Sequence, residues 1–540
     1  MSKKNTLMKN ASLLMVASIV SRIIGLLYRR PLGQVLGREG LGYYAYASNL
    51  YAILLLVSSY SIPMAVSKVV SERLALKQYK NAHKVFKGAL LYALLVGGLA
   101  ALLAFFGGRF LLPRNQQNAV LALRILAPTI LLSAILGVFR GYFQAHNTMM
   151  PTSISQIAEQ IMNAVISVLA GYLLIKGFAK DETTHAVYGA AGGTMGTGAG
   201  VLVGLIFMIF VYLVNKKTID KQMQRDENET EESFGEIFRI IFQLVTPVIF
   251  TTFIYNASAY LDSYIFSSIQ GFHGISSKVI SEQYGEFSNY FITLINVPLS
   301  LASASASAMM PVVSGNYATG QKEDANSQIS ETIKLTMFIC IPAAVGLAVL
   351  AHPIMGVLFP GSTRLASNLL RFGAVSVIFS ALSTITNSVL QSIGEQKTAL
   401  HNAAASLVIN LVMLALILFI APGVGIYAML IVNIAFGVSM CILNGRAIRN
   451  YLGYKNEIED SYGKPFLAAA GMGLITWIIY HGLFILTRRP SIALIISIVV
   501  AIVVYMVLFV IVTGTKEEEM KNFPLGTKIT SFLRLIKVYR

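Results

Sequence analysis

The chain has 540 residues, of which 55% are hydrophobic and only 12% are charged. An ordinary soluble domain carries roughly 25% charged residues, and a water-soluble globule of this length cannot hide so much apolar surface. The net charge of +17 does not indicate a nucleic-acid-binding protein, because the basic residues lie mostly between apolar runs, as juxtamembrane anchors do. The composition therefore predicts an integral membrane protein.

Apolar runs recur along the whole chain, and a membrane-spanning helix needs about 20 apolar residues. A helix satisfies its own backbone hydrogen bonds in lipid, so we expect an all-α protein rather than a barrel of short alternating strands. The polar start of the chain, without a clear cleavage site, indicates an uncleaved first span rather than a signal peptide. The sequence predicts about 14 membrane-spanning helices, at residues 11–33, 42–66, 88–107, 120–142, 152–175, 188–214, 240–267, 287–312, 335–358, 370–392, 400–420, 425–445, 466–486 and 491–513.

The distribution of basic residues predicts the orientation of these spans. With the N-terminus placed inside, the inner segments carry 28 of the 42 lysines and arginines, and the outer segments carry 11. Positive charge gathers on the cytoplasmic side of membrane proteins. We therefore expect a multi-pass protein of the bacterial plasma membrane with both termini in the cytoplasm.

The chain shows signs of an internal duplication. At an offset of 247 residues, Leu123-Arg124 matches Leu370-Arg371, and Asn163 matches Asn410. Many transporters are built from such repeats, so we expect two pseudo-symmetric six-helix lobes around a central cleft. The predicted parts are an N-terminal six-helix lobe at 1–215, a charged cytoplasmic linker at 216–236, a C-terminal six-helix lobe at 237–450, helices 13 and 14 at 451–513, and a cytoplasmic tail at 514–540.

No enzyme signature stands in the sequence. There is no P-loop, so ATP hydrolysis by this chain is not expected. The seven histidines have no metal-ligand spacing, and the two cysteines, Cys340 and Cys441, lie in apolar runs as small hydrophobic residues do. We expect no cofactor, no bound metal and no catalytic residues.

Charged side chains within apolar runs are costly in lipid and usually face a bundle interior or a water-filled path. Arg22 lies in the middle of the first run, where a cavity role is favoured. Arg29 and Arg30 stand near the outer end of that run and equally suit side chains that reach the head groups. Anchoring at the inner face also competes for Lys68 and Arg140.

Acidic and amide side chains form a second group of buried candidates. A helix places Gln156, Glu159 and Asn163 on one face, which we expect to point inward. Asp262, with Asn256 one and a half turns before it, is the chief candidate of the second half. The glycine-rich stretch from Gly189 to Gly200 is interpreted as a close helix-packing surface.

Three stretches together carry a resemblance to a known family. The chain resembles the flippase superfamily of multidrug extruders and polysaccharide exporters, in the Gram-positive branch of MurJ-like lipid II flippases and stage V sporulation protein B-like proteins. The stretches are Ser21-Arg22-Ile23-Ile24-Gly25 through Gly37-Arg38-Glu39-Gly40, Ile62-Pro63-Met64-Ala65-Val66-Ser67-Lys68, and Arg140-Gly141-Tyr142-Phe143-Gln144-Ala145-His146 through Glu159-Gln160.

The resemblance implies a monomeric transporter that carries a polyprenyl-pyrophosphate-linked saccharide through a cleft by alternating access. In MurJ-like proteins an arginine of the Ser-Arg motif lines that cleft, and here it is Arg22. A second arginine that often follows is replaced by Tyr28, which puts the second head-group contact in doubt. The expected substrate-binding residues are Arg22, Arg29, Arg30, Lys68, Arg140 and Gln144, and the expected gating or ion-coupling residues are Glu159, Asp262, Asn163 and Asn256.

Two other functions stay open at this stage. A drug or cation exporter of the same superfamily would want an acidic, aromatic-lined pocket, whereas the charge within the runs is mainly basic. A membrane glycosyltransferase or polymerase would need acidic catalytic residues and a sizeable outer loop. The expected partners are the lipid-linked oligosaccharide, membrane lipids and a coupling ion, sodium or proton.

Overall fold

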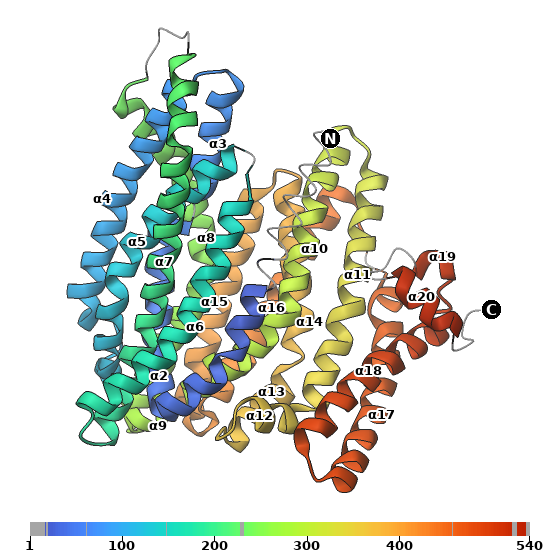
Figure 1. The fold of residues 1–540 in the computed structure, drawn as a ribbon. Coiled ribbons are helices and arrows are strands. Elements are labelled where there is room, and N and C mark those ends of the chain that lie inside the picture. Colours follow the sequence, from blue (N-terminus) through green and yellow to red (C-terminus); the bar gives the residue numbers. More distant parts are fainter. Residues whose placement is uncertain are drawn as a thin grey trace. The chain divides into compact units, whose positions relative to one another are not determined.

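The computed structural model describes residues 17, 20–60, 62–146, 148–226, 232–455, 457–520 and 526–535. Every regular element within these ranges is helical (Figure 1). The contacts divide the chain into two compact units, Met1–Gly285 and Glu286–Arg540, called here the N-terminal and C-terminal units.

The N-terminal unit consists of seven α-helices, the α9 helix that ends one residue beyond it, and two short elements. They are α2 (Arg29–Leu55), η1 (Leu56–Tyr60), α3 (Ile62–Ala75), α4 (Tyr79–Leu111), η2 (Arg114–Ala119), α5 (Val120–Ala145), α6 (Met150–Phe178), α7 (Glu182–Gln224), α8 (Phe234–Phe272) and α9 (Ser277–Glu286). A helical stretch at residues 20–27 precedes α2.

The C-terminal unit is also built from helices. They are η3 (Phe287–Phe291), α10 (Ile292–Ala318), α11 (Lys322–Val349), α12 (Ala351–Leu358), α13 (Arg364–Gly373), α14 (Ser376–Ser392), α15 (Gln396–Ile420), η4 (Pro422–Val424), α16 (Tyr427–Leu452), η5 (Glu459–Gly463), α17 (Lys464–Thr487), α18 (Pro490–Thr513), α19 (Glu517–Met520) and α20 (Gly526–Leu535).

The all-α membrane architecture predicted from the sequence is confirmed. Within the described ranges, 11 helices are long and apolar enough to cross a bilayer, or 12 if the pair α13–α14, bent by 48°, counts as one span. The difference from 14 has two sources: α8, which holds the predicted span 240–267, is not among them, and the first predicted span lies partly outside the described residues. The protein is a multi-pass membrane protein.

Two predicted span boundaries can be compared with the backbone. Gly37 has a φ of 69°, which breaks the helix between the first two predicted spans. This left-handed conformation suits glycine because it has no Cβ. The single span predicted at 335–358 is wrong as one helix, because the chain leaves helical geometry at Leu350 and α12 starts as a separate short helix.

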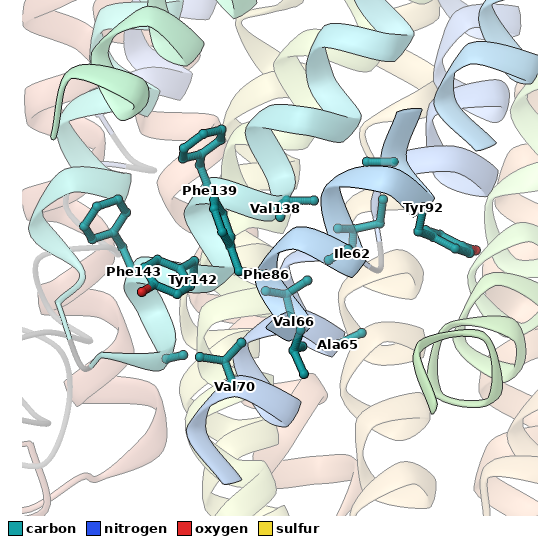
Figure 2. Packing of buried hydrophobic residues seen from close by; sticks show 14 of the residues in the cluster. Ile62, Ala65, Val66, Val70, Phe86, Tyr92, Val138, Phe139, Tyr142 and Phe143 are labelled. Carbon is teal, nitrogen blue, oxygen red and sulfur yellow. The ribbon is translucent and has the colours of Figure 1, made fainter. Parts of the chain in front are cut away.

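An apolar cluster holds α3, α4 and α5 together in the N-terminal unit (Figure 2). The Phe86 ring of α4 lies between two rings of α5, with centroids 5.2 Å from Phe139 and 4.6 Å from Tyr142. Val66 and Val70 of α3 are fully buried in the same cluster. Aromatic burial of this kind fixes the rotation of α5 about its axis, and therefore the direction in which the residue after Phe139 points.

Glycines of α7 allow α6 to pack at backbone distance. A Cβ atom on Gly192 would lie 2.5 Å from the carbonyl oxygen of Ala170, and one on Gly200 would lie 2.5 Å from that of Glu159. Gly196, midway between them, faces Ser167 just as closely. The spacing of four residues places all three glycines on one face of α7. The predicted role of this stretch in close helix packing is confirmed.

The helix boundaries of the two halves repeat, as expected of pseudo-symmetric lobes. An offset of 243 places Tyr79, the first residue of α4, on Lys322, the first residue of α11. An offset of 247 places Ala145, the last residue of α5, on Ser392, the last residue of α14. The sequence offsets thus relate the start of one helix and the end of another in the two halves, although α4 and α5, with 33 and 26 residues, are longer than α11 and α14, with 28 and 17.

The charged segment between the halves is shorter than the predicted linker. α7 continues to Gln224 and α8 begins at Phe234, so only the middle of 216–236 lies outside these two helices. Asp226 accepts a hydrogen bond from the backbone N–H of Lys80 at 2.6 Å, and Glu232 lies 2.6 Å from the guanidinium of Arg73. Both described ends of the segment are therefore fixed to the α3–α4 turn. The cytoplasmic location of this segment stays a prediction.

The last two long helices form a hairpin that packs against α11 in the C-terminal unit. The Phe338 ring of α11 lies 5.4 Å from Tyr505 and 4.7 Å from Phe509 of α18. These helices correspond to the predicted helices 13 and 14. Both cysteines are free thiols: Cys340 is buried, and Cys441 lies 3.3 Å from the carbonyl oxygen of Phe379.

Candidate functional site

The polar centre of the N-terminal unit is an ion pair between α5 and α6. Arg140 Nη2 donates to Glu159 Oε2 at 2.8 Å, and Arg140 Nε donates to Ser155 Oγ at 3.0 Å. The side chains of Arg140 and Glu159 are 16% and 23% exposed, and Ser155 is fully buried. Arg140 and Glu159 were both predicted as site residues, and the structure pairs them with each other. A guanidinium held this way has a carboxylate partner that an incoming phosphate can replace.

A second polar cluster lies one turn further along α6. The Ser167 hydroxyl is 2.9 Å from Asn163 Oδ1 and 2.8 Å from the carbonyl oxygen of Gly193 on α7. The hydroxyl of Tyr28 forms side-chain hydrogen bonds with Asn163 and Tyr44. The predicted polar face of α6 therefore packs inside the unit. Tyr28 therefore belongs to this cluster.

The arginines of the first predicted span do not share one environment. Arg22 and Arg30 are exposed, whereas Arg29 is half-buried. The stretch that carries Arg22 packs beside α6, because a Cβ on Gly25 would lie 3.9 Å from Gln160 Oε1. The role of Arg22 in substrate binding stays a prediction.

Buried oxygens without a hydrogen-bond partner in the described part of the chain lie on these same two elements. Among the described residues, Ser21 Oγ and Gln156 Oε1 have no hydrogen-bond partner. Buried polar atoms without a partner are rare, because each loses its hydration without compensation. Together with the Glu159 carboxylate they add oxygen ligands to the polar face of α6. Among the described residues, however, no group of three or more His, Cys, Asp or Glu side chains could hold a metal ion.

The remaining predicted residues differ in their exposure. Lys68 in the middle of α3 is exposed, and Gln144 at the end of α5 is half-buried. Asp262 of α8 is 7% exposed and accepts a hydrogen bond from Ser258 Oγ at 2.7 Å, while Asn256 is exposed. The structure therefore brings together Arg140 and Glu159 of the ten candidates, with Asn163 one turn away. The roles assigned to all ten stay predictions.

Sequence reasoning missed a set of polar contacts around α9, called here the α9 contacts. Ser281 Oγ donates to Gln116 Oε1 at 2.5 Å, and Ser277 Oγ donates to the carbonyl oxygen of Asn115 at 2.5 Å. A Cβ on Gly42 of α2 would lie 2.5 Å from the carbonyl carbon of Ser281. The α9 backbone therefore touches α2 directly, with its polar side chains paired to η2.

The α9 contacts continue along the same face of α2. The Tyr284 ring lies 4.4 Å from the Tyr46 ring at a tilt of 32°, and its hydroxyl accepts a hydrogen bond from Asn49. Glu282 lies 3.0 Å from Arg38. These contacts explain why α8 and α9 group with the helices before them. The boundary between compact units falls after Gly285 rather than at the charged segment. The predicted six-helix lobes stay a prediction.

Comparison with known families decides the relationship of the chain. A family profile described as "Polysaccharide biosynthesis protein" matches residues 7–317, more than half of the chain. The chain belongs to this polysaccharide biosynthesis family. A second profile, described as MatE, matches residues 247–416. The family resemblance predicted from the three sequence stretches is confirmed.

Two relatives of this polysaccharide biosynthesis family member come from Bacillus subtilis (strain 168). Lipid II flippase MurJ is 26% identical over 426 residues, which cover 75% of this chain and 76% of the relative. Stage V sporulation protein B is 23% identical over 482 residues, which cover 88% of this chain and 89% of the relative.

Solved structures show the same fold. A structure described as lipid II flippase MurJ in an inward closed conformation matches with a TM-score of 0.65 and 16% identity, over 92% of this chain and 98% of that chain. An inward-facing multidrug resistance MATE family transporter of the MOP superfamily matches with a TM-score of 0.58 and 16% identity, over 83% of this chain and 99% of that chain. The polysaccharide biosynthesis family member thus has the fold of MOP superfamily transporters.

Proposed function

We propose that this protein is a transporter, not an enzyme, that moves a polyprenyl-pyrophosphate-linked saccharide from the inner to the outer leaflet of the bacterial plasma membrane. The substrate class is lipid II or a surface-polysaccharide unit. The observation that carries the proposal is a guanidinium, that of Arg140, held within the apolar N-terminal unit of a polysaccharide biosynthesis family chain. Charged groups buried among the apolar helices of membrane proteins often mark substrate or ion pathways.

The Arg140–Glu159 pair supports an exchange of partners during transport. Arginine binds phosphate oxygens through paired hydrogen bonds, as it binds a carboxylate. Arg22 attracts the pyrophosphate first, because it is exposed, and the Arg140 guanidinium then leaves Glu159 for the phosphate. Glu159 is left free to take up a proton or a sodium ion beside Gln156. Sodium and proton both suit a carboxylate that gains and loses an arginine partner.

The membrane potential acts in the required direction. In a cell that is negative inside, an anionic head group that moves outward moves down the electrical gradient. The gain is about 2.3 kcal/mol per elementary charge per 100 mV. The lipid tail stays in the bilayer, so the protein has to shelter only the sugar and the phosphates.

The α9 contacts support alternating access. In the predicted orientation, with both termini cytoplasmic, Gly42, Gln116 and Ser281 all lie toward the outer side of the membrane. Contacts between backbone atoms at this end close the outer side of the N-terminal unit. We propose that the outward-open form requires α9 to separate from α2 and η2, and that substrate binding favours this separation.

A second candidate function is export of drugs or organic cations. It is favoured by the MatE profile match over residues 247–416 and by the fold shared with a multidrug MATE transporter. The mainly basic charge in the N-terminal unit argues against a cationic substrate. Efflux of fluorescent cationic dyes from cells that express the protein separates the two functions.

Reconstitution into liposomes tests the leading proposal. The purified protein is combined with lipid II, with a polyprenyl-linked surface-polysaccharide unit, or with neither, and the sugar that reaches the opposite leaflet is measured. Arg22→Ala is expected to abolish flipping while the protein stays inserted, and Arg22→Lys to retain part of it. Arg489→Ala, in the loop between α17 and α18, serves as the control. Full flipping by Arg22→Ala, or no movement of either lipid by the unaltered protein, would contradict the proposal.

A further inference from the structure

A polar cavity lies in the C-terminal unit, on elements that the proposed transport step does not use. It has a volume of about 490 Å³ and opens to the surface. Its walls come from the first half of α11 and from the chain that follows α16. The lining residues are Asn326, Ser327, Ser330, Glu331, Lys334, Tyr454, Lys455 and Glu457.

Two contacts fix the walls of this cavity to each other. Lys334 lies 2.7 Å from Glu457, so these two charges neutralise one another. The side-chain amide of Asn326 donates to the carbonyl oxygen of Leu452 at 3.0 Å. An ion pair and a hydrogen bond between α11 and the chain after α16 therefore fix the shape of the cavity.

The lining groups that do not take part in these two contacts determine which ligand the cavity can bind. Among the described residues, Glu331 and Lys455 form no ion pair, which leaves one negative and one positive charge at the cavity. Asn326 Oδ1 is buried and, within the described ranges, has no donor. An orphaned acceptor beside a free carboxylate calls for a ligand that brings N–H groups.

Hydroxyl groups supply donors beside these charges. Burial raises the pKa of the Tyr454 hydroxyl, and the nearby Glu457 charge raises it further, although the neighbouring Ser330 hydroxyl acts in the opposite direction. Tyr454 is therefore protonated at neutral pH and can donate a hydrogen bond. A phosphate group accepts such bonds together with the charge of a lysine.

We propose that this cavity binds a zwitterionic aminoalkyl-phosphate head group, as carried by phosphatidylethanolamine. The phosphate lies against Lys455 and the Tyr454 hydroxyl, and the ammonium lies against Glu331 and Asn326 Oδ1. The site takes a membrane lipid rather than the transported saccharide, so the proposal goes beyond the transport function and does not depend on it.

The chain beside the cavity favours a lipid as the source of this head group. Ile458, directly after the lining residue Glu457, is 72% exposed. Phe466 and Leu467 at the start of α17 are 53% and 63% exposed. Large exposed apolar side chains next to a polar cavity suit a ligand that joins a charged head to acyl chains.

Native mass spectrometry of the purified full-length protein tests the proposal. The protein is supplied with phosphatidylethanolamine or phosphatidylglycerol of identical acyl chains, and the lipid that it retains is measured. We expect phosphatidylethanolamine to be retained in preference. Glu331→Gln and Lys455→Gln should each lower its retention about tenfold, the loss of one charge-assisted contact, and Lys455→Arg should keep it. Equal retention of the two lipids, or unchanged retention in both variants, overturns the proposal.

Matched controls and a competition complete the test. Glu182→Gln and Lys180→Gln remove the same charges at the α6–α7 turn and should leave lipid retention unchanged. Loss of retention in these controls as well would overturn the assignment to the cavity. Soluble phosphoethanolamine at the concentration of the lipid should not displace it, because it lacks acyl chains. Displacement would show that the site takes a soluble zwitterion and would overturn the lipid assignment.

Discussion

Arg140 donates to the carboxylate of Glu159 and to the hydroxyl of Ser155, so one side chain of α5 holds two positions of α6 that lie a turn apart. Both acceptors stand on the helix that also carries Gln156. The rotation of α5 that aims the guanidinium is fixed by the aromatic packing around Phe139. The position of the charge in the polar centre therefore depends on the packing of an apolar cluster.

The first prediction concerns the energy of this ion pair. Arg140→Ala and Glu159→Ala should each lower the free energy of unfolding by about 1–3 kcal/mol, because each leaves a mostly buried charge without its partner. The double variant should lower the free energy of unfolding by clearly less than the sum of the two single effects. A double-mutant cycle from denaturant unfolding in detergent measures this coupling.

The exposed pair Lys278–Glu182 is the control for this cycle. It should show little coupling, because water screens both charges. Strictly additive effects of Arg140→Ala and Glu159→Ala would contradict the interpretation of the ion pair as a stabilising contact.

The second prediction concerns the glycine face of α7. Gly200→Ala should destabilise the protein by about 1–3 kcal/mol, because the new methyl group would overlap the backbone of Glu159. Gly98→Ala on α4 is the matched control, because a Cβ there meets no atom within 4 Å. It should be neutral or stabilise by about 0.5–1 kcal/mol. Thermal unfolding of the two variants measures the difference, and equal effects would be the contrary result.

The third prediction concerns the α9 contacts. Gly42→Ala places a methyl group against the Ser281 backbone and should favour separation of α9 from α2. In a background with Cys340 and Cys441 replaced, Ser281→Cys should react slowly with a membrane-impermeant thiol reagent, because Ser281 is fully buried. Gly42→Ala should raise the labelling rate several-fold.

Gly356→Ala is the control for this labelling experiment, since a Cβ on Gly356 meets no atom within 4 Å. It should leave the rate unchanged. Slow labelling that does not respond to Gly42→Ala would show that the outer contacts do not open, and that access to the proposed pathway lies elsewhere.

The fourth prediction concerns pH and the start of α7. The Asp181 carboxylate accepts a hydrogen bond from the backbone N–H of Thr184 at 2.7 Å, and this bond lowers the pKa of Asp181 below its ordinary value of 3.8. A lowered pKa in the folded state contributes stability above the ordinary value and loses it as the pH falls through the lowered one. The Asp181→Ala variant should therefore have a lower melting temperature than the unaltered protein at neutral pH, and the difference in melting temperature should decrease in acid. Melting curves across this pH range check it; a difference that does not depend on pH would rule out the charged cap.

Local sequence signals predicted most of the fold. The apolar runs marked the spans, because only a helix buries its backbone polar groups in lipid. The glycine-rich stretch from Gly189 to Gly200 predicted close helix packing, but not that α6 is the partner. Arg140 and Glu159 were each predicted as buried candidates from their surroundings alone. Their pairing was not, because it depends on how α5 and α6 are shifted along one another, which neither helix encodes by itself.

The α9 contacts had even less signal in the sequence. The residues that make these contacts, Asn115, Gln116 and Ser281, are polar and lie near helix ends. Residues of these types are common in the turns of any protein, so they indicate no particular contact. Gly42 alone hinted at a close approach, but a single glycine does not name its partner. Contacts of this kind arise from the packing of segments more than 150 positions apart, so a pattern of local period cannot reveal them.

The length of α7 has a consequence for what surrounds the protein. Its 43 residues span about 65 Å at 1.5 Å per residue, and even at a 40° tilt they extend about 50 Å, more than the roughly 40–45 Å of a whole bilayer with its head groups. The end of this helix therefore stands in the aqueous compartment, carrying with it the anchored Asp226. A water-soluble protein that approaches from that side therefore contacts the projecting end of α7 before it reaches the lipid surface.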